Sequence, residues 1–300
     1  MSRGRAVGFF APSGFLPDPA VVDRAAQYFA ARGWRVCAGD GVFERHQRFA
    51  GPDELRLAEL QRFATDRTLD VAVAARGGYG LSRLLDRIDY DAIRAAQPIL
   101  VGYSDFTAFN LAYLARAGGI SFQGPSASDF ADGATHDFTT SNFFAAISNA
   151  RHEVQFESEA ADLDVRGRLW GGNLTVLCAL LGTAYLPRVR GGILFLEDVN
   201  EAAYRVERML WQLVHAGVIG VQKAVILGDF EPVPAMPNDN GYGLPQAIEQ
   251  LRLRAGVPVV TGLPFGHRQR RATLPVGAEA RLLVHGTRAT LAFEEHPVLR

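Results

Sequence analysis

The feature that most constrains the fold is an alternation, in the first half of the chain, between short apolar runs and longer amphipathic stretches. The amphipathic stretches repeat their apolar positions at helical spacing, and turn residues bound the short runs. Strands and helices that alternate in this way build a parallel sheet covered by helices. We expect strands at residues 7–10, 35–38, 71–74, 99–101 and 120–122, and helices at residues 19–31, 53–64, 81–86, 91–96 and 106–117.

The second half mixes the two patterns and becomes rich in strands toward its end. We expect strands at residues 192–196 and 224–228, helices at residues 174–181, 202–216 and 245–254, and a closing β-meander of strands at residues 273–275, 280–284 and 289–293. After a predicted helix at 142–150, the stretch 151–164 is acidic and has no long apolar run, so we place a domain boundary there. The predicted fold class is α/β, with an amino-terminal parallel doubly wound α/β domain (residues 1–155) and a carboxyl-terminal mixed α/β domain with a β-rich end (residues 156–300).

Charge and hydropathy exclude several classes of partner. The chain has 31 Lys and Arg against 32 Asp and Glu, with both signs interspersed, so it offers no basic stripe for nucleic acid. Its apolar runs are far shorter than the roughly 20 residues that span a bilayer, and the first of them ends in a turn-like segment unlike a secretory signal. The only cysteines, Cys37 and Cys178, lack metal-ligand or CxxC spacing. We expect a cytoplasmic protein without membrane or nucleic-acid partners.

One segment has the form of a nucleophile elbow. Residues 98–106 run from a buried strand through Gly102 and Ser104 directly into a predicted helix. The Ser104 hydroxyl would then project at the carboxyl edge of the sheet, and the N–H of Asp105 would point there from a helix N-terminus. The alternative is that Ser104 or Asp105 caps the helix. Phe106 replaces the second glycine of G-x-S-x-G, which argues against an ordinary α/β-hydrolase.

A glycine cluster, Arg76-Gly77-Gly78-Tyr79-Gly80, follows the predicted strand at 71–74. Its backbone can approach a ligand closely, and the strand ends at the same edge of the sheet as Ser104. An N–H from Gly78 would complete an oxyanion hole there. A phosphate loop and a plain turn are the alternatives, although the cluster lacks the Lys-Ser/Thr of a P-loop and Arg83 occupies the third glycine position of G-x-G-x-x-G.

A serine nucleophile needs a base and a group that orients the base. Among seven histidines, His267 lies in a tight loop after the strand-like residues 259–261, whereas His215 sits near the end of a predicted helix, where a capping role explains it. Glu197 directly follows the apolar run 192–196, at the end of a strand where substrates bind in α/β folds. We interpret Asp198 and Glu201 as acids at the start of the next helix. No metal-ligand spacing is present, so we expect no metal and no cofactor.

Taken together, these segments resemble the LD-carboxypeptidase family, the muramoyl-tetrapeptide carboxypeptidases. The resemblance covers nearly the whole chain and rests on residues 11–14, 76–80 with 83–85, 102–105, 171–174 with 181–183, 196–198, and 266–267 near 273–277. It implies that Ser104 is the nucleophile, His267 the general base and Glu197 its orienting acid, with the backbone N–H groups of Gly78 and Asp105 as oxyanion hole.

The resemblance also implies a substrate, a murein tetrapeptide cut before its terminal D-Ala, and a homodimer with the site between two domains. From the matched blocks we expect Arg76, Gly77, Tyr79 and Asn173 to bind substrate. Two alternatives remain open. Related enzymes that cleave peptidyl-nucleotide antibiotics and give immunity would have the same catalytic residues, and a non-catalytic ligand-binding module would also explain two α/β domains.

Overall fold

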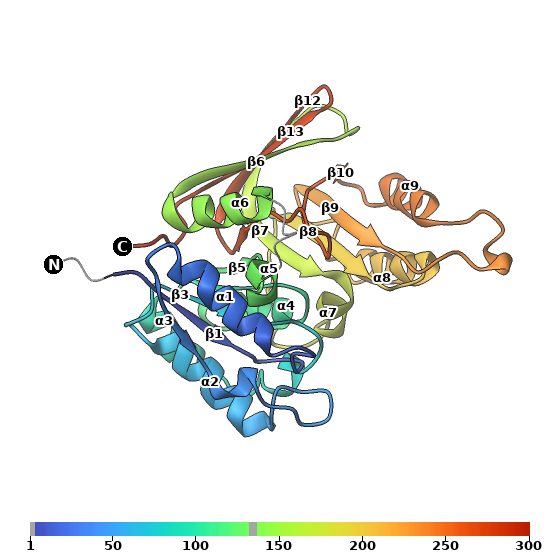
Figure 1. Cartoon of the computed structure of the whole chain (residues 1–300). Helices are drawn as coiled ribbons and strands as arrows, with labels where there is room; N and C mark the ends of the chain where they lie inside the picture. The colour runs from blue at the N-terminus through green and yellow to red at the C-terminus, as the bar shows by residue number, and fades with distance from the viewer. Residues whose placement is uncertain (1–3, 132–136) are drawn as a thin grey trace.

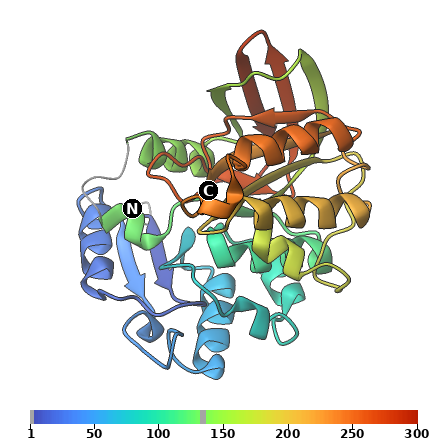
Figure 2. The same ribbon diagram turned by 90° about the vertical axis from the view of Figure 1, so that its right-hand side faces the viewer.

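The computed structural model describes residues 4–131 and 137–300, which build two sheets with their helices. In Figure 2 the lobe of the first sheet, blue to cyan, lies below the lobe of the second, yellow to red. Within the described residues, no helix is long and apolar enough to cross a membrane.

The first sheet has six strands in the order β11-β5-β4-β3-β1-β2. Strands β1 (Ala6–Phe10), β2 (Arg35–Ala38), β3 (Val71–Ala74), β4 (Leu100–Gly102) and β5 (Ser121–Gln123) run parallel, and β11 (Leu274–Val276) joins β5 antiparallel. Every residue of β1, β3 and β4 is buried, as expected for a sheet covered on both faces. All five predicted strands of the first half are therefore present, within one residue of their predicted ends.

Helices cover both faces of this sheet (Figure 1). Phe9 packs with Phe29 of α1 (Ala20–Ala30) on one face, where α5 (Ala127–Ala131) and α6 (Asp137–Ser148) add further side chains. Phe10, from the opposite face of the same strand, stacks on Phe63 of α2 (Asp53–Thr65), beside α3 (Tyr90–Ala96) and α4 (Thr107–Ala117). This arrangement confirms the predicted doubly wound layout.

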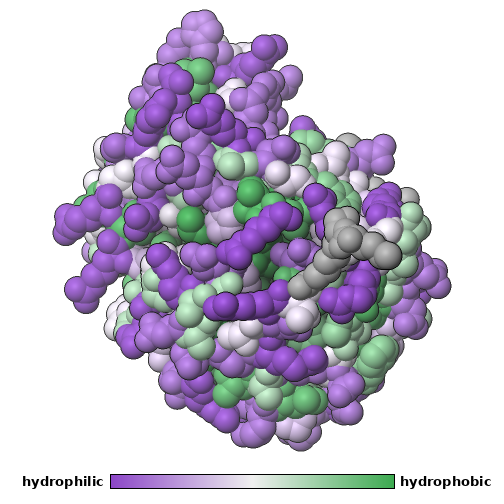
Figure 3. Space-filling view, turned by 90° about the vertical axis from the view of Figure 1, so that its left-hand side faces the viewer, coloured by the Kyte–Doolittle hydropathy of each residue, from purple (hydrophilic) through white to green (hydrophobic). Residues whose placement is uncertain are grey.

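The second sheet has seven strands in the order β10-β9-β8-β7-β12-β13-β6. Its parallel half contains β7 (Leu163–Asn173), β8 (Ile193–Val199), β9 (Ala224–Glu231) and β10 (Val259–Thr261), with α7 (Leu174–Ala179), α8 (Ala203–His215) and α9 (Leu244–Arg254). Its antiparallel half contains β12 (Glu279–His285), β13 (Arg288–Glu294) and β6 (Arg151–Glu157). This half projects from the body in Figure 1, and Figure 3 shows its surface to be largely hydrophilic from that side.

Two predictions about elements are wrong, and strand β6 was not predicted. The strand at 273–275 was expected in the closing meander, yet β11 pairs with β5 of the first sheet, where all three of its residues are buried. Residues 81–86 form only a short 3₁₀ turn, Leu81–Arg83, whose first N–H bonds to the carboxylate of Asp105. The acidic stretch begins with strand β6, whose acids lie on the exposed face while Val154 and Phe156 are buried. The division at residues 155 and 156 stays a prediction.

Candidate active site

Ser104 lies on a strained turn between β4 and α4. Its φ of +61° is in the left-handed region, which non-glycine residues seldom adopt and which costs about 1–3 kcal/mol. The buried side chain of Asp105 anchors this turn by accepting hydrogen bonds from the Ser13 hydroxyl (2.7 Å) and the Leu81 N–H (2.9 Å). Burial raises the pKa of the Asp105 carboxyl. Neither Ser104 nor Asp105 caps the following helix with its side chain, so the capping alternative does not explain this segment.

The glycine cluster packs directly against this turn. A Cβ on Gly77 would lie 2.8 Å from the Ser104 Cβ and 3.1 Å from its Oγ, so only glycine fits. Gly78 follows with a φ of +105°. The Gly77 carbonyl accepts the N–H of Gly14 at 3.1 Å, which ties the cluster to the loop after β1. The structure therefore brings Gly77 and Gly78 beside Ser104, as the sequence predicts.

Arg76 and Tyr79 of the cluster flank the site. Arg76 is half-buried, and its Nη1 donates a hydrogen bond to the carbonyl of Phe15. Tyr79 is exposed, and its ring lies 5.7 Å from the guanidinium carbon of Arg48. Arg76 therefore helps to hold the loop after β1, while Tyr79 remains open to a ligand.

Glu197 is positioned by a β-bulge. Leu196 pairs with Leu227 of β9, but Asp198 pairs with Phe230, so two residues of β9, Gly228 and Asp229, oppose Glu197. The N–H of Asp229 donates to the carbonyl of Phe265 at 2.8 Å, and a Cβ on Gly228 would lie 2.2 Å from that same oxygen. The bulge thus docks the loop that carries His267 beside Glu197.

His267 and Glu197 form a direct hydrogen bond. The Nδ1 atom of His267 lies 2.8 Å from Oε2 of Glu197, whose side chain is fully buried, while the His267 side chain is 17% exposed. A carboxylate only accepts hydrogen bonds, so Nδ1 carries the proton and Nε2 is left as an acceptor. This is the tautomer that a general base for a serine hydroxyl requires.

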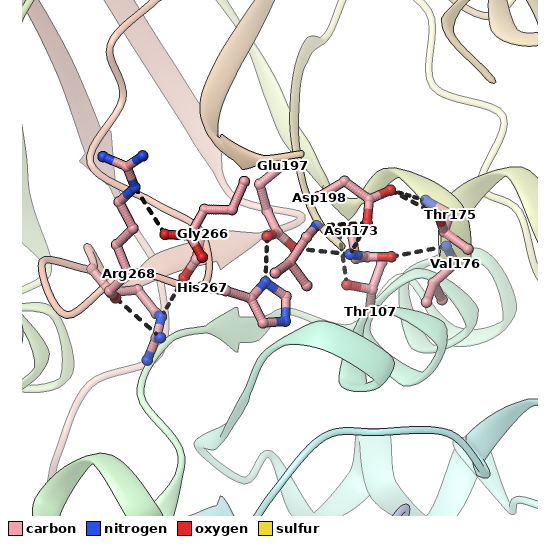
Figure 4. Close-up of polar contacts among 12 residues, drawn as sticks. Thr107, Asn173, Thr175, Val176, Glu197, Asp198, Gly266, His267 and Arg268 are labelled. Atoms are coloured by element: carbon pink, nitrogen blue, oxygen red, sulfur yellow. Dashed lines mark hydrogen bonds and ion pairs between the residues drawn. The ribbon is translucent and has the colours of Figure 1, made fainter. Parts of the chain in front are cut away.

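Asn173 lies beside Glu197, at the neighbouring position on β7 (Figure 4). Its Nδ2 donates to Oε1 of Glu197 (3.2 Å) and to Oδ1 of Asp198 (3.0 Å), while its Oδ1 accepts the N–H of Val176 (3.0 Å) and so caps α7. Asn173 is buried, and internal partners occupy both ends of its amide. This geometry argues against the predicted contact with substrate and gives Asn173 the task of orienting Glu197.

Asp198 bonds to the N-terminus of a different helix from the one expected. Its Oδ2 accepts hydrogen bonds from the N–H (2.9 Å) and the hydroxyl (2.8 Å) of Thr175, at the start of α7. The acid therefore serves the helix N-terminus of a neighbouring element, and the interpretation of Asp198 as an acid at the start of α8 is wrong. Burial raises the pKa of its carboxyl.

The two halves of the site meet at the first turn of α4. The Thr107 hydroxyl accepts the N–H of Asn173 (3.0 Å) and the side-chain amide of Gln123 (2.7 Å), and the ring of Tyr103 lies 5.2 Å from the His267 ring. Tyr103, the residue directly before Ser104, is therefore in contact with His267. Within residues 4–131 and 137–300, the Ser104 hydroxyl makes no hydrogen bond, and the contact between the Tyr103 and His267 rings brings the two segments together.

A cavity of about 640 Å³ lies elsewhere, with residues 166–168 and 183–184 in its lining, and contains none of the predicted site residues. Among the described residues, no group of three or more His, Cys, Asp or Glu side chains is placed to hold a metal ion. We therefore define the candidate site by its geometry and its hydrogen bonds.

The sequence matches two family models, the LD-carboxypeptidase N-terminal domain over residues 7–124 and the LD-carboxypeptidase C-terminal domain over residues 166–282. A probable murein peptide carboxypeptidase of Bacillus subtilis (strain 168) is 30% identical over 287 residues, which cover 94% of this chain and 90% of the relative.

Two solved structures share the fold. The muramoyltetrapeptide carboxypeptidase from Oxalobacter formigenes is 40% identical, with a TM-score of 0.92 over 98% of this chain and 100% of that chain. MccF in complex with glutamyl sulfamoyl guanosine is 23% identical, with a TM-score of 0.86 over 99% of this chain and 98% of that chain, a likeness that shows the fold alone. The chain therefore belongs to the LD-carboxypeptidase family and is a serine-type carboxypeptidase.

Proposed function

We propose that this protein is an LD-carboxypeptidase that releases the C-terminal D-Ala from murein tetrapeptides in peptidoglycan recycling. The bond between His267 and the fully buried Glu197, next to the strained turn of Ser104, is the observation that carries the proposal. The names of the relatives, a murein peptide carboxypeptidase and a muramoyltetrapeptide carboxypeptidase, support the substrate class. We place the reaction in the cytoplasm and expect a homodimer.

In the first step, Nε2 of His267 takes the proton from the Ser104 hydroxyl as Oγ attacks the carbonyl carbon of the scissile amide. Glu197 holds the imidazole in the required tautomer and stabilises the imidazolium that forms. The oxyanion of the tetrahedral intermediate accepts hydrogen bonds from the N–H groups of Gly78 and Asp105. The carbon–nitrogen bond then breaks, the imidazolium gives its proton to the leaving amine of D-Ala, and an acyl-enzyme ester on Ser104 remains.

In the second step, a water molecule attacks the ester carbonyl while Nε2 of His267 takes its proton. The ester bond breaks, the proton passes to Oγ of Ser104, and the tripeptide leaves with a new carboxylate. Every proton transfer in this cycle uses His267, so the reaction proceeds without a metal ion or cofactor.

Substrate recognition is assigned to the rim formed by the glycine cluster. Tyr79 follows Gly78 in the chain and is exposed, and its ring lies 5.7 Å from the guanidinium carbon of Arg48, so an apolar face and a positive charge lie side by side at this rim. Murein peptides carry several carboxylates, which such a rim can bind. Arg76 supports the rim through its bond to Phe15. We assign Asn173 to the orientation of Glu197 in place of substrate contact.

The proposed stereochemistry follows from holding the carbonyl oxygen and the terminal carboxylate at fixed points. Exchange of D-Ala for L-Ala then swaps the methyl group and the hydrogen, and accommodating the misplaced methyl displaces the carbonyl from Ser104. A displacement of about 1 Å costs about 100-fold in rate. A pentapeptide ending in D-Ala-D-Ala would be a poor substrate, because its scissile bond lies between two D-residues.

The test compares initial rates below KM on three synthetic peptides: the tetrapeptides ending in D-Ala and in L-Ala, and the pentapeptide. We expect strong preference in kcat/KM for the first. Equal rates on the two tetrapeptides would contradict LD specificity, whatever the mechanism. A glutamyl-nucleotide conjugate serves as the fourth substrate, and a kcat/KM on it above that for the D-Ala tetrapeptide would favour the immunity function instead.

A further inference from the structure

We propose that Arg271 is a positioning residue for catalysis, because its guanidinium fixes the His267 loop against the segment that carries Ser104. The inference rests on the proposed function, in which His267 is the general base. It concerns a side chain that follows His267 by four residues and that neither the motifs nor the hydrogen bonds of the triad include.

Arg271 holds the backbone on both sides of His267. Its Nε donates to the carbonyl of Gly266 at 2.7 Å, and its Nη2 donates to the carbonyl of Arg268 at 3.2 Å. One planar group thus holds the peptide that precedes His267 and the peptide that follows Arg268. Since the loop belongs to no helix or strand, these two bonds act in place of a regular backbone ladder.

The same guanidinium contacts the first lobe. Its Nη1 forms an ion pair with Asp129 of α5 at 2.7 Å, and its central carbon lies 3.7 Å from the centroid of the Tyr103 ring. Tyr103 directly precedes Ser104, and its ring also meets the His267 ring edge to face at 5.2 Å. Burial raises the pKa of Tyr103 to about 12, so its ring remains a neutral phenol facing the cation. Arg271 therefore links the base and the nucleophile segment through one side chain.

The burial of Arg271 sets it apart from its neighbours. Its side chain is 2% exposed, whereas Arg268 is 58% exposed and Arg270 also lies at the surface. A buried cation is costly unless its hydrogen bonds and its charge are matched. The Asp129 carboxylate balances the positive charge of Arg271, and the two backbone carbonyls accept its remaining hydrogen bonds. The planar guanidinium can donate to all three partners at once, whereas the single ammonium group of a lysine cannot.

Arg271 reaches His267 through the backbone, so its loss should slow catalysis more than it weakens binding. His267 must accept a proton from Ser104 and then deliver it to the leaving group. A loop displaced by about 1 Å would lower kcat by about 100-fold and leave KM nearly unchanged. The imidazole bond to Glu197 depends on the same loop, so its Nδ1 proton reports the loop position independently of activity.

The experiment uses the full chain with Arg271→Lys, and Arg268→Lys and Arg270→Lys as matched controls. Kinetics on the D-Ala tetrapeptide are combined with thermal unfolding and with the low-field ¹H NMR signal of the His267 Nδ1 proton, assigned with His267→Ala. We expect R271K to remain folded, to lose about 100-fold in kcat with KM within about threefold, and to shift or lose the imidazole signal. The two controls should match the wild type in all three measurements.

Other outcomes discriminate further. R271K with wild-type kcat and an unchanged imidazole signal overturns the inference. Should R271K fail to fold, the double variant Arg271→Met with Asp129→Asn removes both charges together, which avoids an uncompensated buried carboxylate. Retention of kcat by the folded double variant, or failure of both variants to fold, also overturns the positioning role. An active His267→Ala would refute the proposed function instead, independently of Arg271.

Discussion

Glu197→Gln is the substitution whose consequence the geometry specifies most fully. The two oxygens of Glu197 have different partners: Oε1 accepts from Asn173 Nδ2 at 3.2 Å, and Oε2 faces His267 Nδ1 at 2.8 Å. Asn173 keeps its orientation because its Oδ1 accepts the N–H of Val176. The introduced amide must therefore turn its oxygen to Asn173 and its NH₂ group to His267. Nδ1 then becomes the acceptor, and the imidazole proton moves to Nε2, the atom that should receive the proton of Ser104.

The expected loss of kcat follows from the free-energy cost of flipping the introduced amide. Flipping the amide would restore the productive tautomer but would set two NH₂ groups against each other in a buried site, at about 1–3 kcal/mol, or about 5- to 150-fold. Loss of the charge that stabilises the imidazolium adds about 1–2 kcal/mol. Together the two effects raise the barrier by about 2–5 kcal/mol, so we expect kcat to fall by about 30- to 5,000-fold. The acid-to-amide change in a serine-protease triad costs about 10⁴.

The assay measures kcat and KM on the D-Ala tetrapeptide together with the melting temperature. Glu197→Gln should unfold within a few degrees of the wild type, because the amide has the same shape and removes a buried charge. The control is Glu201→Gln, four residues along the chain. The ion pair of Glu201 with Arg205 is loose at 3.8 Å, so this variant should keep full activity. A folded Glu197→Gln with less than a tenfold loss in kcat would refute the reasoning.

Two further predictions concern the site and the stability of the fold. Gly77→Ala should lower kcat strongly, because its methyl group would come within 2.8 Å of the Ser104 Cβ. The control Gly220→Ala, whose methyl group would have its nearest neighbour at 3.9 Å, should keep the wild-type kcat. Equal kinetics of the two variants would contradict the predicted clash. Burial lowers the pKa of His152 and His296, so below pH about 6.5 the unfolded chain binds protons that the folded protein does not, and the free energy of unfolding falls with decreasing pH. Urea unfolding between pH 7.5 and 5 should show a shallower fall for His296→Gln, by up to about 1.4 kcal/mol per pH unit, and parallel curves would show that His296 does not contribute.

The sequence predicted the parallel sheet well because its buried strands are continuous apolar runs that helical stretches separate. The same patterns located Ser104, Gly77 and Gly78, because strand ends and glycines mark the carboxyl edge of such a sheet. Their proximity in the structure follows from the order of β3 and β4 in the sheet. The pairing of Glu197 with His267 agrees with the prediction, although the β-bulge that aligns them has no signature in the sequence.

The remaining features depend on contacts between distant segments. Strand β11 is three residues long, and only its burial against β5 decides which sheet it joins. Asp198 follows a strand and precedes a helix, yet it bonds to Thr175 because β7 and β8 are adjacent. Arg271 stands in a run of charged residues that is typical of a solvated surface, and its burial depends on the packing of α5 against the His267 loop.

The most direct test of the central claim, that Ser104 is the nucleophile, is Ser104→Ala assayed for D-Ala release from the murein tetrapeptide by mass spectrometry. The substitution removes one hydroxyl that has no hydrogen-bond partner among the described residues, so the variant should melt as the wild type does. We predict that kcat falls by about 10⁴ to 10⁶ while the peptide still binds. A folded Ser104→Ala enzyme that keeps more than about a tenth of the wild-type rate would contradict the account.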